Sequence, residues 1–200
     1  LGYIFPDREA RKWYVFNGES AEAISDNGME HYLKNNMSFK LLEQFPNYKA
    51  VDIKIPNGIG YSFGLDNTLN RLMLTKIDYE AKDPGSLTLH SDGKTFNGGS
   101  IFLGDSEHFH NRSFTISYSL KDKQWVSNHY YTPLIYAWNR YDMYAFGKGL
   151  KSGDYGMWIF NTPGDYQTFF EQYYPFIIEY VIKNKESFDA FQYVSTELDT

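Results

Sequence analysis

The strictest pattern in this chain is a period-two alternation between residues 113 and 120. Large apolar side chains occupy every second position, and serine or threonine occupies the positions between them. The apolar members are Phe114, Ile116, Tyr118 and Leu120, and the polar members are Ser113, Thr115, Ser117 and Ser119. Successive side chains of a β-strand point to opposite faces, so we expect a strand with one buried and one solvated face.

The same scheme of strand, polar turn and strand recurs along the chain. The hairpins that we expect are residues 3–16, 62–75, 115–126 and 134–146. Their turns are unevenly spaced, which falls short of a demonstrated propeller period. Residues 176–182 read as a further strand, whereas residues 187–198 fit both a helix and a strand. We therefore predict a mostly β fold of antiparallel hairpins in blade-like or propeller-like sheets.

A minor helical part is expected near residues 27–45. One short helix should begin at Asp26 or Asn27, because both residue types cap helix N-termini well. A second should begin near Ser38 and end at Pro46, since proline lacks the amide that a helix interior needs. The fold class is thus β with one or two short helices.

The length and the turn content bear on domain organisation. The chain has 200 residues, enough for one domain with a buried core. Residues 83–111 contain three strong turn sequences in quick succession, which indicates a loop-rich insertion with short strands at 86–90 and 100–103. The sequence begins at Leu1 without a methionine. We expect residues 1–200 to be a single β-rich domain, or a fragment of a larger protein or a processed product.

Charge and composition argue against several classes of protein. The net charge is −6 and no basic run occurs, which disfavours a groove that neutralises many phosphates. The longest apolar stretch near the C-terminus is broken at Glu179, far short of the ~20 residues of a membrane span. We therefore expect no membrane insertion. The chain has no cysteine, so a disulfide scaffold, a zinc ribbon and a cysteine nucleophile are excluded.

One segment groups potential metal ligands. His108 and His110 would share one face of a strand, with Asp105 and Glu107 close in sequence. A protein metal site needs a third ligand, which the sequence does not identify. A solvated polar loop is the favoured interpretation, so we expect no metal and keep His108 and His110 as the only candidates.

Motifs for catalysis are missing from the sequence. Residues 98–100 lack the final glycine of a nucleophile elbow, and residues 147–149 have the wrong spacing for a phosphate loop. Carboxylates are plentiful, but none is distinguished by its neighbours as the acid or base of a glycan hydrolase. We expect no catalytic residue and no cofactor, and the chain is predicted not to be an enzyme.

Aromatic residues make up 19% of the chain, and several stand beside amide side chains. Flat rings next to Asn and Gln suit a sugar-binding face, through stacking and directional hydrogen bonds. Aromatics also build the cores of small β domains and are enriched at protein interfaces, which we favour. We expect the core to include Trp13, Phe16, Phe114, Ile116, Tyr118, Trp125, Tyr144 and Phe146. The residues that we single out as possible ligand or interface aromatics are Trp125, Tyr136, Trp138 and Trp158. An exposed, coplanar row among them would favour sugar binding, and burial would favour a structural role.

The aromatic strand patterns also resemble a known family. The matching segments include NRLMLTK at 70–76, YSL at 118–120, WVS at 125–127, HYYTP at 129–133, MYAF at 143–146 and FEQYYP at 170–175. The opening segment RKWYVFNG at 11–18 fits the same pattern. Together they resemble virion structural proteins of crAss-like tailed bacteriophages, those of the tail nozzle or muzzle. Residues 83–111 are the part that does not match.

This resemblance implies a non-enzymatic structural module located in the virion tail. Its partners would be copies of itself in a ring, other tail proteins, and exiting phage DNA that passes through the channel without sequence-specific contact. The resemblance carries over no catalytic residue and no cofactor. The alternative that stays open is a carbohydrate-binding or host-surface adhesion module, which would use exposed aromatics.

Overall fold

The structure, a computed structural model, describes residues 2–52, 58–148, 154–161, 168–174, 176–183 and 191–198. Antiparallel strands are the main regular structure of these residues, and two α-helices accompany them. The predicted mostly β fold class is therefore confirmed, and the propeller-like arrangement stays a prediction. All four expected hairpins are present.

A four-stranded antiparallel sheet forms the centre of the molecule. Its order is β4 (Gly60–Asp66), β5 (Arg71–Ile77), β8 (Phe114–Ser119) and β9 (Gln124–His129). The alternating segment is β8, as predicted, but its expected solvated face is wrong. Thr115, Ser117 and Ser119 are as buried as their apolar neighbours. The physical reason is that this sheet is covered on both faces.

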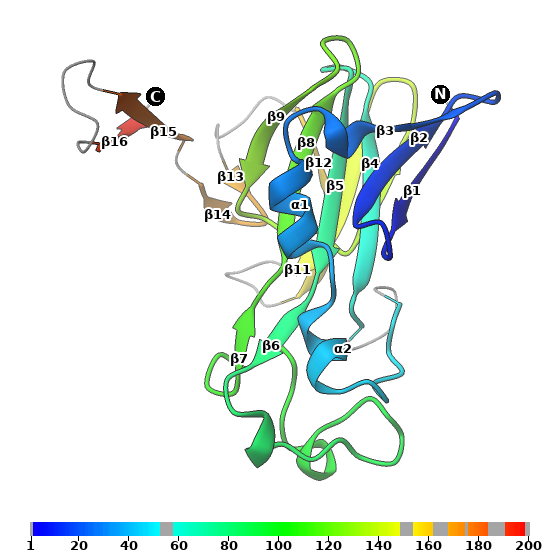
Figure 1. Ribbon diagram of the computed structural model, residues 1–200, viewed down its shortest axis with the longest axis vertical. Helices are drawn as coiled ribbons and strands as arrows, with labels where there is room; N and C mark the ends of the chain where they lie inside the picture. Colours follow the sequence, from blue (N-terminus) through cyan, green and yellow to red (C-terminus); the bar gives the residue numbers. More distant parts are fainter. Residues whose placement is uncertain are drawn as a thin grey trace.

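One face of the central sheet packs against the N-terminal segment (Figure 1). This layer contains β1 (Tyr3–Asp7), β2 (Lys12–Phe16), β3 (Ala21–Ala23), η1 (Ile24–Asp26) and α1 (Glu30–Asn36). The buried side chains Trp13, Leu33 and Met37 contact Leu72, Leu74, Ile116 and Tyr118 of the sheet. The apolar half of the alternation therefore faces a largely aliphatic and aromatic core.

The opposite face of the central sheet packs against a second, three-stranded sheet. Its order is β10 (Ile135–Trp138), β11 (Met143–Lys148) and β12 (Tyr155–Ile159). The two sheets approach closely at Gly64, where an added Cβ would lie 2.7 Å from the ring of Tyr136. The Tyr136 hydroxyl lies 2.8 Å from Thr75 Oγ1, which is also 2.8 Å from Thr115 Oγ1. The polar half of the alternation is thus buried with its hydrogen bonds made inside the protein.

The expected insertion at residues 83–111 belongs to a lower lobe of the molecule (Figure 1). This lobe holds α2 (Lys40–Gln44), β6 (Tyr79–Ala81), η2 (Pro84–Ser86), η3 (Asn97–Gly99) and β7 (Phe109–Asn111). Residues from 39–50 and 83–111 share one core, which includes Phe39, Phe96 and Phe109. The loops are therefore anchored by aromatic packing.

Helix starts and minor strands differ in detail from the expectations. Helix α1 begins at Glu30, because the residues expected to cap it belong to η1 or the turn after it. Single bridges, Leu89 with Phe96 and Phe96 with Ile101, stand where short strands were expected in the loop-rich segment.

The remaining strands form two separate ribbons. Strand β13 (Thr168–Phe169) pairs with β14 (Gln172–Tyr173). Strand β15 (Phe176–Lys183) pairs with β16 (Phe191–Leu198). The second pairing confirms the strand predicted at 176–182 and decides between strand and helix for residues 191–198.

Candidate interaction surface

The sheet β10–β11–β12 has one buried face and one open face. Tyr136, Met143 and Ala145 point inward, where they join Met73 of the central sheet in a buried cluster. The strand register places two complete rows of residues on the other face, beside the shorter pair of Lys148 and Tyr155. One row is Ile135, Phe146 and Met157, and the next row is Ala137, Tyr144 and Ile159. We call these six residues the outer face.

The outer face is apolar and exposed. The exposed fractions are 37% for Ile135, 40% for Phe146, 55% for Met157 and 45% for Ile159. Scattered apolar residues on a surface need no explanation, whereas adjacent rows of them on a regular sheet are a candidate interaction surface. The expectation that Phe146 is a core residue is wrong, because no described part of the chain covers β11 on this side.

Opposite charges stand at the two ends of the outer face. Asp142 precedes β11 and Lys148 ends it, so both share the face of Tyr144 and Phe146. The Tyr144 hydroxyl donates to Asp142 Oδ2 at 3.3 Å, which places that carboxylate beside the apolar rows. Lys148 is exposed and forms no ion pair with the part of the chain that the structure describes.

The four aromatics singled out from the sequence lie in separate surroundings. Trp125 donates from Nε1 to the carbonyl of Ile24 at 3.1 Å, within the N-terminal core. Tyr136 is buried between the sheets. The Trp158 ring lies 4.7 Å from the ring of Phe170. Of the four, only Trp138 is exposed, with an exposed fraction of 41%. The four residues therefore form no exposed row.

The two candidate metal ligands lie at the start of β7 and have few partners. His108 Nε2 is 4.0 Å from Asp105 Oδ2, and His110 is exposed on the strand opposite Glu80. Within the described ranges, no three His, Asp or Glu side chains come close enough together to hold a metal ion. The structure therefore adds no ligand to the pair.

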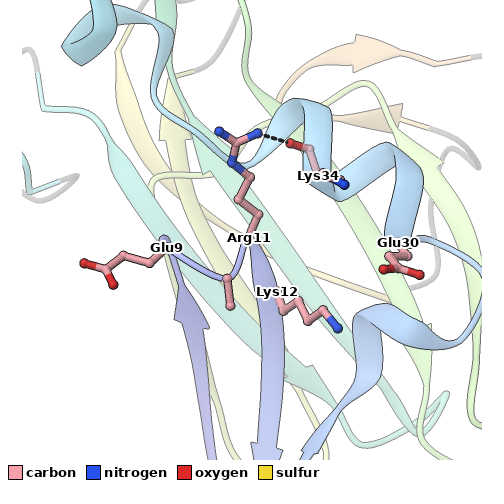
Figure 2. Close-up of a pocket in the computed structure, with 6 residues that line it drawn as sticks. Glu9, Arg11, Lys12, Glu30 and Lys34 are labelled. Atoms are coloured by element: carbon pink, nitrogen blue, oxygen red, sulfur yellow. Dashed lines mark hydrogen bonds between the residues drawn. The ribbon is translucent and has the colours of Figure 1, made fainter.

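A charged hollow of about 430 Å³ lies between the β1–β2 turn and α1. Figure 2 shows Glu9, Arg11, Lys12, Glu30 and Lys34 around it. The Arg11 guanidinium donates to the carbonyl of Lys34 at 2.8 Å and so ties the turn to the helix. The other charges are spread over an open surface and do not converge on one point, so this hollow is a poor candidate for chemistry.

The most perturbed ionisable pair is buried at the junction between the layers and the lower lobe. Lys76 and Asp78 are 1% and 0% exposed, and Lys76 Nζ lies 2.7 Å from Asp78 Oδ2. Lys76 Nζ also donates to the carbonyls of Asn36 and Ser38, at 2.7 and 2.6 Å. Burial lowers the pKa of Lys76 and raises the pKa of Asp78, while each partner's charge opposes the shift. Because solvent cannot reach it, the pair is a structural link.

The Asp78 carboxylate also caps a helix. It accepts hydrogen bonds from the backbone N–H groups of Lys40 and Leu41, at 2.8 and 3.3 Å. These are unsatisfied donors at the start of α2, where a negative charge is favourable. Sequence reasoning expected a cap near Ser38 and had no signal for a residue 38 positions away.

A second ionisable group with a shifted pKa lies half-buried on β9. His129 Nε2 is 3.0 Å from Ser117 Oγ, and its ring centroid lies 5.1 Å from that of Tyr131. Burial, with a smaller contribution from the Arg71 charge, lowers the pKa of His129 to about 4. The imidazole is therefore neutral at pH 7 and part of the packing between the sheets.

The outer face is the candidate that sequence reasoning missed. Its signal was present, because β11 reads Met-Tyr-Ala-Phe and so carries apolar residues in both parities. Apolar residues on both faces are typical of a strand that is packed against other layers on both sides. No α-helix in the described parts of the chain is long and apolar enough to cross a membrane. Comparison with protein-family models and with curated proteins gives no match for the chain.

Proposed function

We propose that this chain is a non-enzymatic structural module of a phage virion tail, which assembles through protein–protein contacts. The observation that carries the assembly role is the outer face, an exposed apolar surface on a rigid, internally packed sheet. The virion assignment draws on the family resemblance of the aromatic strand segments. A module of this kind holds its position in a larger assembly and converts no substrate.

The use of the aromatic residues supports a structural role. Three clusters, together with the partly buried rings packed against them, contain most of the aromatic side chains that the structure describes, and they lie between the layers and inside the lower lobe. Packed antiparallel layers resist distortion because many ladder hydrogen bonds and side-chain contacts must break together. Rigidity of this kind suits a module that transmits force within an assembly.

Quantitative peptide mass spectrometry on purified virions of the source phage tests the tail role. We expect peptides of this chain at a fixed ratio to the portal protein. Lysates of infected cells are the control, because they contain non-virion phage proteins as well. Peptides found in lysates and missing from virions would overturn the tail assignment.

A carbohydrate-binding module is the second candidate, and the β10–β11 hairpin favours it. Trp138 and Tyr141 are both exposed there, and the Asn139 and Asp142 side chains lie between and beside them. A ring next to amide and carboxylate groups can stack on a sugar and bond its hydroxyls. A glycan-array screen with Trp138→Ala tests it, with Phe102→Ala as the control at another exposed ring. Binding that Trp138→Ala removes and Phe102→Ala leaves intact would favour this candidate.

A further inference from the structure

We propose that the outer face packs against the same face of a second copy of this chain, about a two-fold axis that runs across the strands. The outer face is the surface that the proposed function uses, and this inference rests on that function only in treating the face as an interface. It adds the face through which two copies meet and the orientation of the contact. Both follow from where the charges and the side-chain sizes lie.

The charges select the partner and the axis. Asp142 and Lys148 flank the outer face at equal distances from Ala145, the middle of β11. A two-fold axis across the strands at this point reverses the strand direction, so that Asp142 of each copy meets Lys148 of the other. An axis along the strands would place like charges opposite each other, which is destabilising. The face is thus complementary to itself in one orientation.

The apolar rows agree with the same axis. Rotation about Ala145 places the row of Phe146 on the row of Tyr144 from the other copy, because the two rows flank that position. Phe146 then meets Tyr144, an aromatic pair of the kind that stabilises interfaces. Along the same rows, Ile135 meets the small Ala137, and Met157 meets Ile159. Every contact made by these rows is then apolar or aromatic, and the small Ala137 leaves room for Ile135.

The size of the face sets the expected affinity. The three strands have four, six and five residues. At about 3.3 Å per residue and about 4.8 Å between strands, they cover roughly 240 Å². A stable interface buries about 800 Å² on each partner. We therefore expect a weak pairing, with a dissociation constant of about 10 μM to 1 mM, which gains strength when several contacts act together in an assembly.

The first experiment is sedimentation equilibrium of the whole chain from about 10 μM to about 500 μM, a range that brackets the expected constant. We expect a monomer–dimer equilibrium for the wild type and at least tenfold weaker pairing for Phe146→Ser. Phe102→Ser is the matched control, since Phe102 is an exposed ring in the lower lobe. It should pair as the wild type does. A wild type that stays monomeric throughout, or equal weakening by both variants, would overturn the inference.

The second experiment uses charge reversal and isolates the partner and the axis. Lys148→Glu gives the face two acids, and Asp142→Lys gives it two bases, so each variant alone should lose pairing at least tenfold. An equimolar mixture of the two variants should regain it, because every charge then meets its opposite. A mixture that pairs no better than either variant alone would overturn the antiparallel two-fold contact. Far-UV circular dichroism confirms that both variants are folded.

The two proposals fail in different assays. A monomeric wild type overturns the pairing and leaves the virion ratio unaffected. A chain missing from virions overturns the tail role and leaves the dimerisation of the isolated chain intact. Sedimentation equilibrium therefore tests the pairing of two copies, and mass spectrometry of virions independently tests the tail role.

Discussion

The molecule holds charged side chains in two contrasting places. At the junction with the lower lobe, Lys76 and Asp78 are fully buried, and Lys76 Nζ has three oxygen partners within 2.7 Å. In the hollow beside α1, five charged residues line an open surface, and one of them, Lys12, pairs with the exposed Asp26 at the same 2.7 Å. The distances match, but the surroundings differ.

The difference teaches that desolvation decides what an ion pair does to stability. Water screens the Lys12–Asp26 pair and solvates either group when the other is removed. Nothing solvates Asp78 when Lys76 is removed, so the buried charge would be left without its strongest partner. The buried pair also joins β5 to the start of α2, while the exposed pair joins neighbouring surface segments.

The largest effect is expected for Lys76→Met. This change leaves the Asp78 carboxylate buried with only its backbone partners, and we expect a loss of about 3–5 kcal/mol in the free energy of unfolding. Urea denaturation followed by tryptophan fluorescence measures it. Lys12→Met is the matched control in the exposed pair. Equal midpoints for the two variants would contradict the role assigned to burial.

Acid should destabilise the protein through His129. Its folded-state pKa of about 4 lies below the usual 6.5, so the unfolded chain takes up a proton first as the pH falls. Stability attributable to this group is therefore present above pH 6.5 and is lost towards pH 4, by about 2–3 kcal/mol. Urea midpoints across this range should fall less in His129→Gln. His90→Gln, at an exposed histidine, should keep the wild-type slope.

A double variant sharpens the comparison further. Adding Asp78→Asn to Lys76→Met removes the unpaired charge and keeps an oxygen that can cap α2. We expect it to recover about 1–3 kcal/mol relative to Lys76→Met alone, since residues in direct contact couple by this amount. A double-mutant cycle from urea denaturation gives the coupling. Simple additivity of the two single changes would show that the pair does not act as a unit.

The smallest effect is expected for the exposed pair itself. Lys12→Met should change the urea midpoint by no more than the scatter between repeat measurements, because water replaces the lost contact. Salt should matter little as well, since the wild-type pair is already screened. Comparing midpoints at low and at high salt checks both statements. A clear drop for Lys12→Met would mean that the hollow contributes to stability as the buried pair does.

The strands were predictable because their signals are local. Period-two alternation placed β8, and polar turns placed the hairpins at 3–16, 62–75 and 134–146. Phe114, Ile116 and Tyr118 lie in the core, as the pattern indicates. The pattern wrongly predicted a solvated face for β8. Serine and threonine are usually exposed, and the sequence does not show the hydrogen-bond partners that allow them to be buried.

The candidate surface was less predictable. Trp125, Tyr136 and Trp158 were chosen for their ring chemistry, and the structure packs them among other side chains. Phe146 was assigned to the core because it is a large apolar residue on a predicted strand. Its strand does have a buried face, and the register places Phe146 on the other one. The sequence of a strand shows which residues share a face. It does not show which of the two faces is buried.

The sequence by itself determined the β class, the hairpin pairs, the two short helices and the aromatic character of the cores. These depend on contacts and propensities between residues near one another in the chain. The tertiary structure alone decided that both faces of β8 are buried, that Asp78 caps α2 and pairs with Lys76, and that one apolar face of β11 stays open. Each of these depends on which layers stack, and stacking joins segments that lie far apart in the sequence.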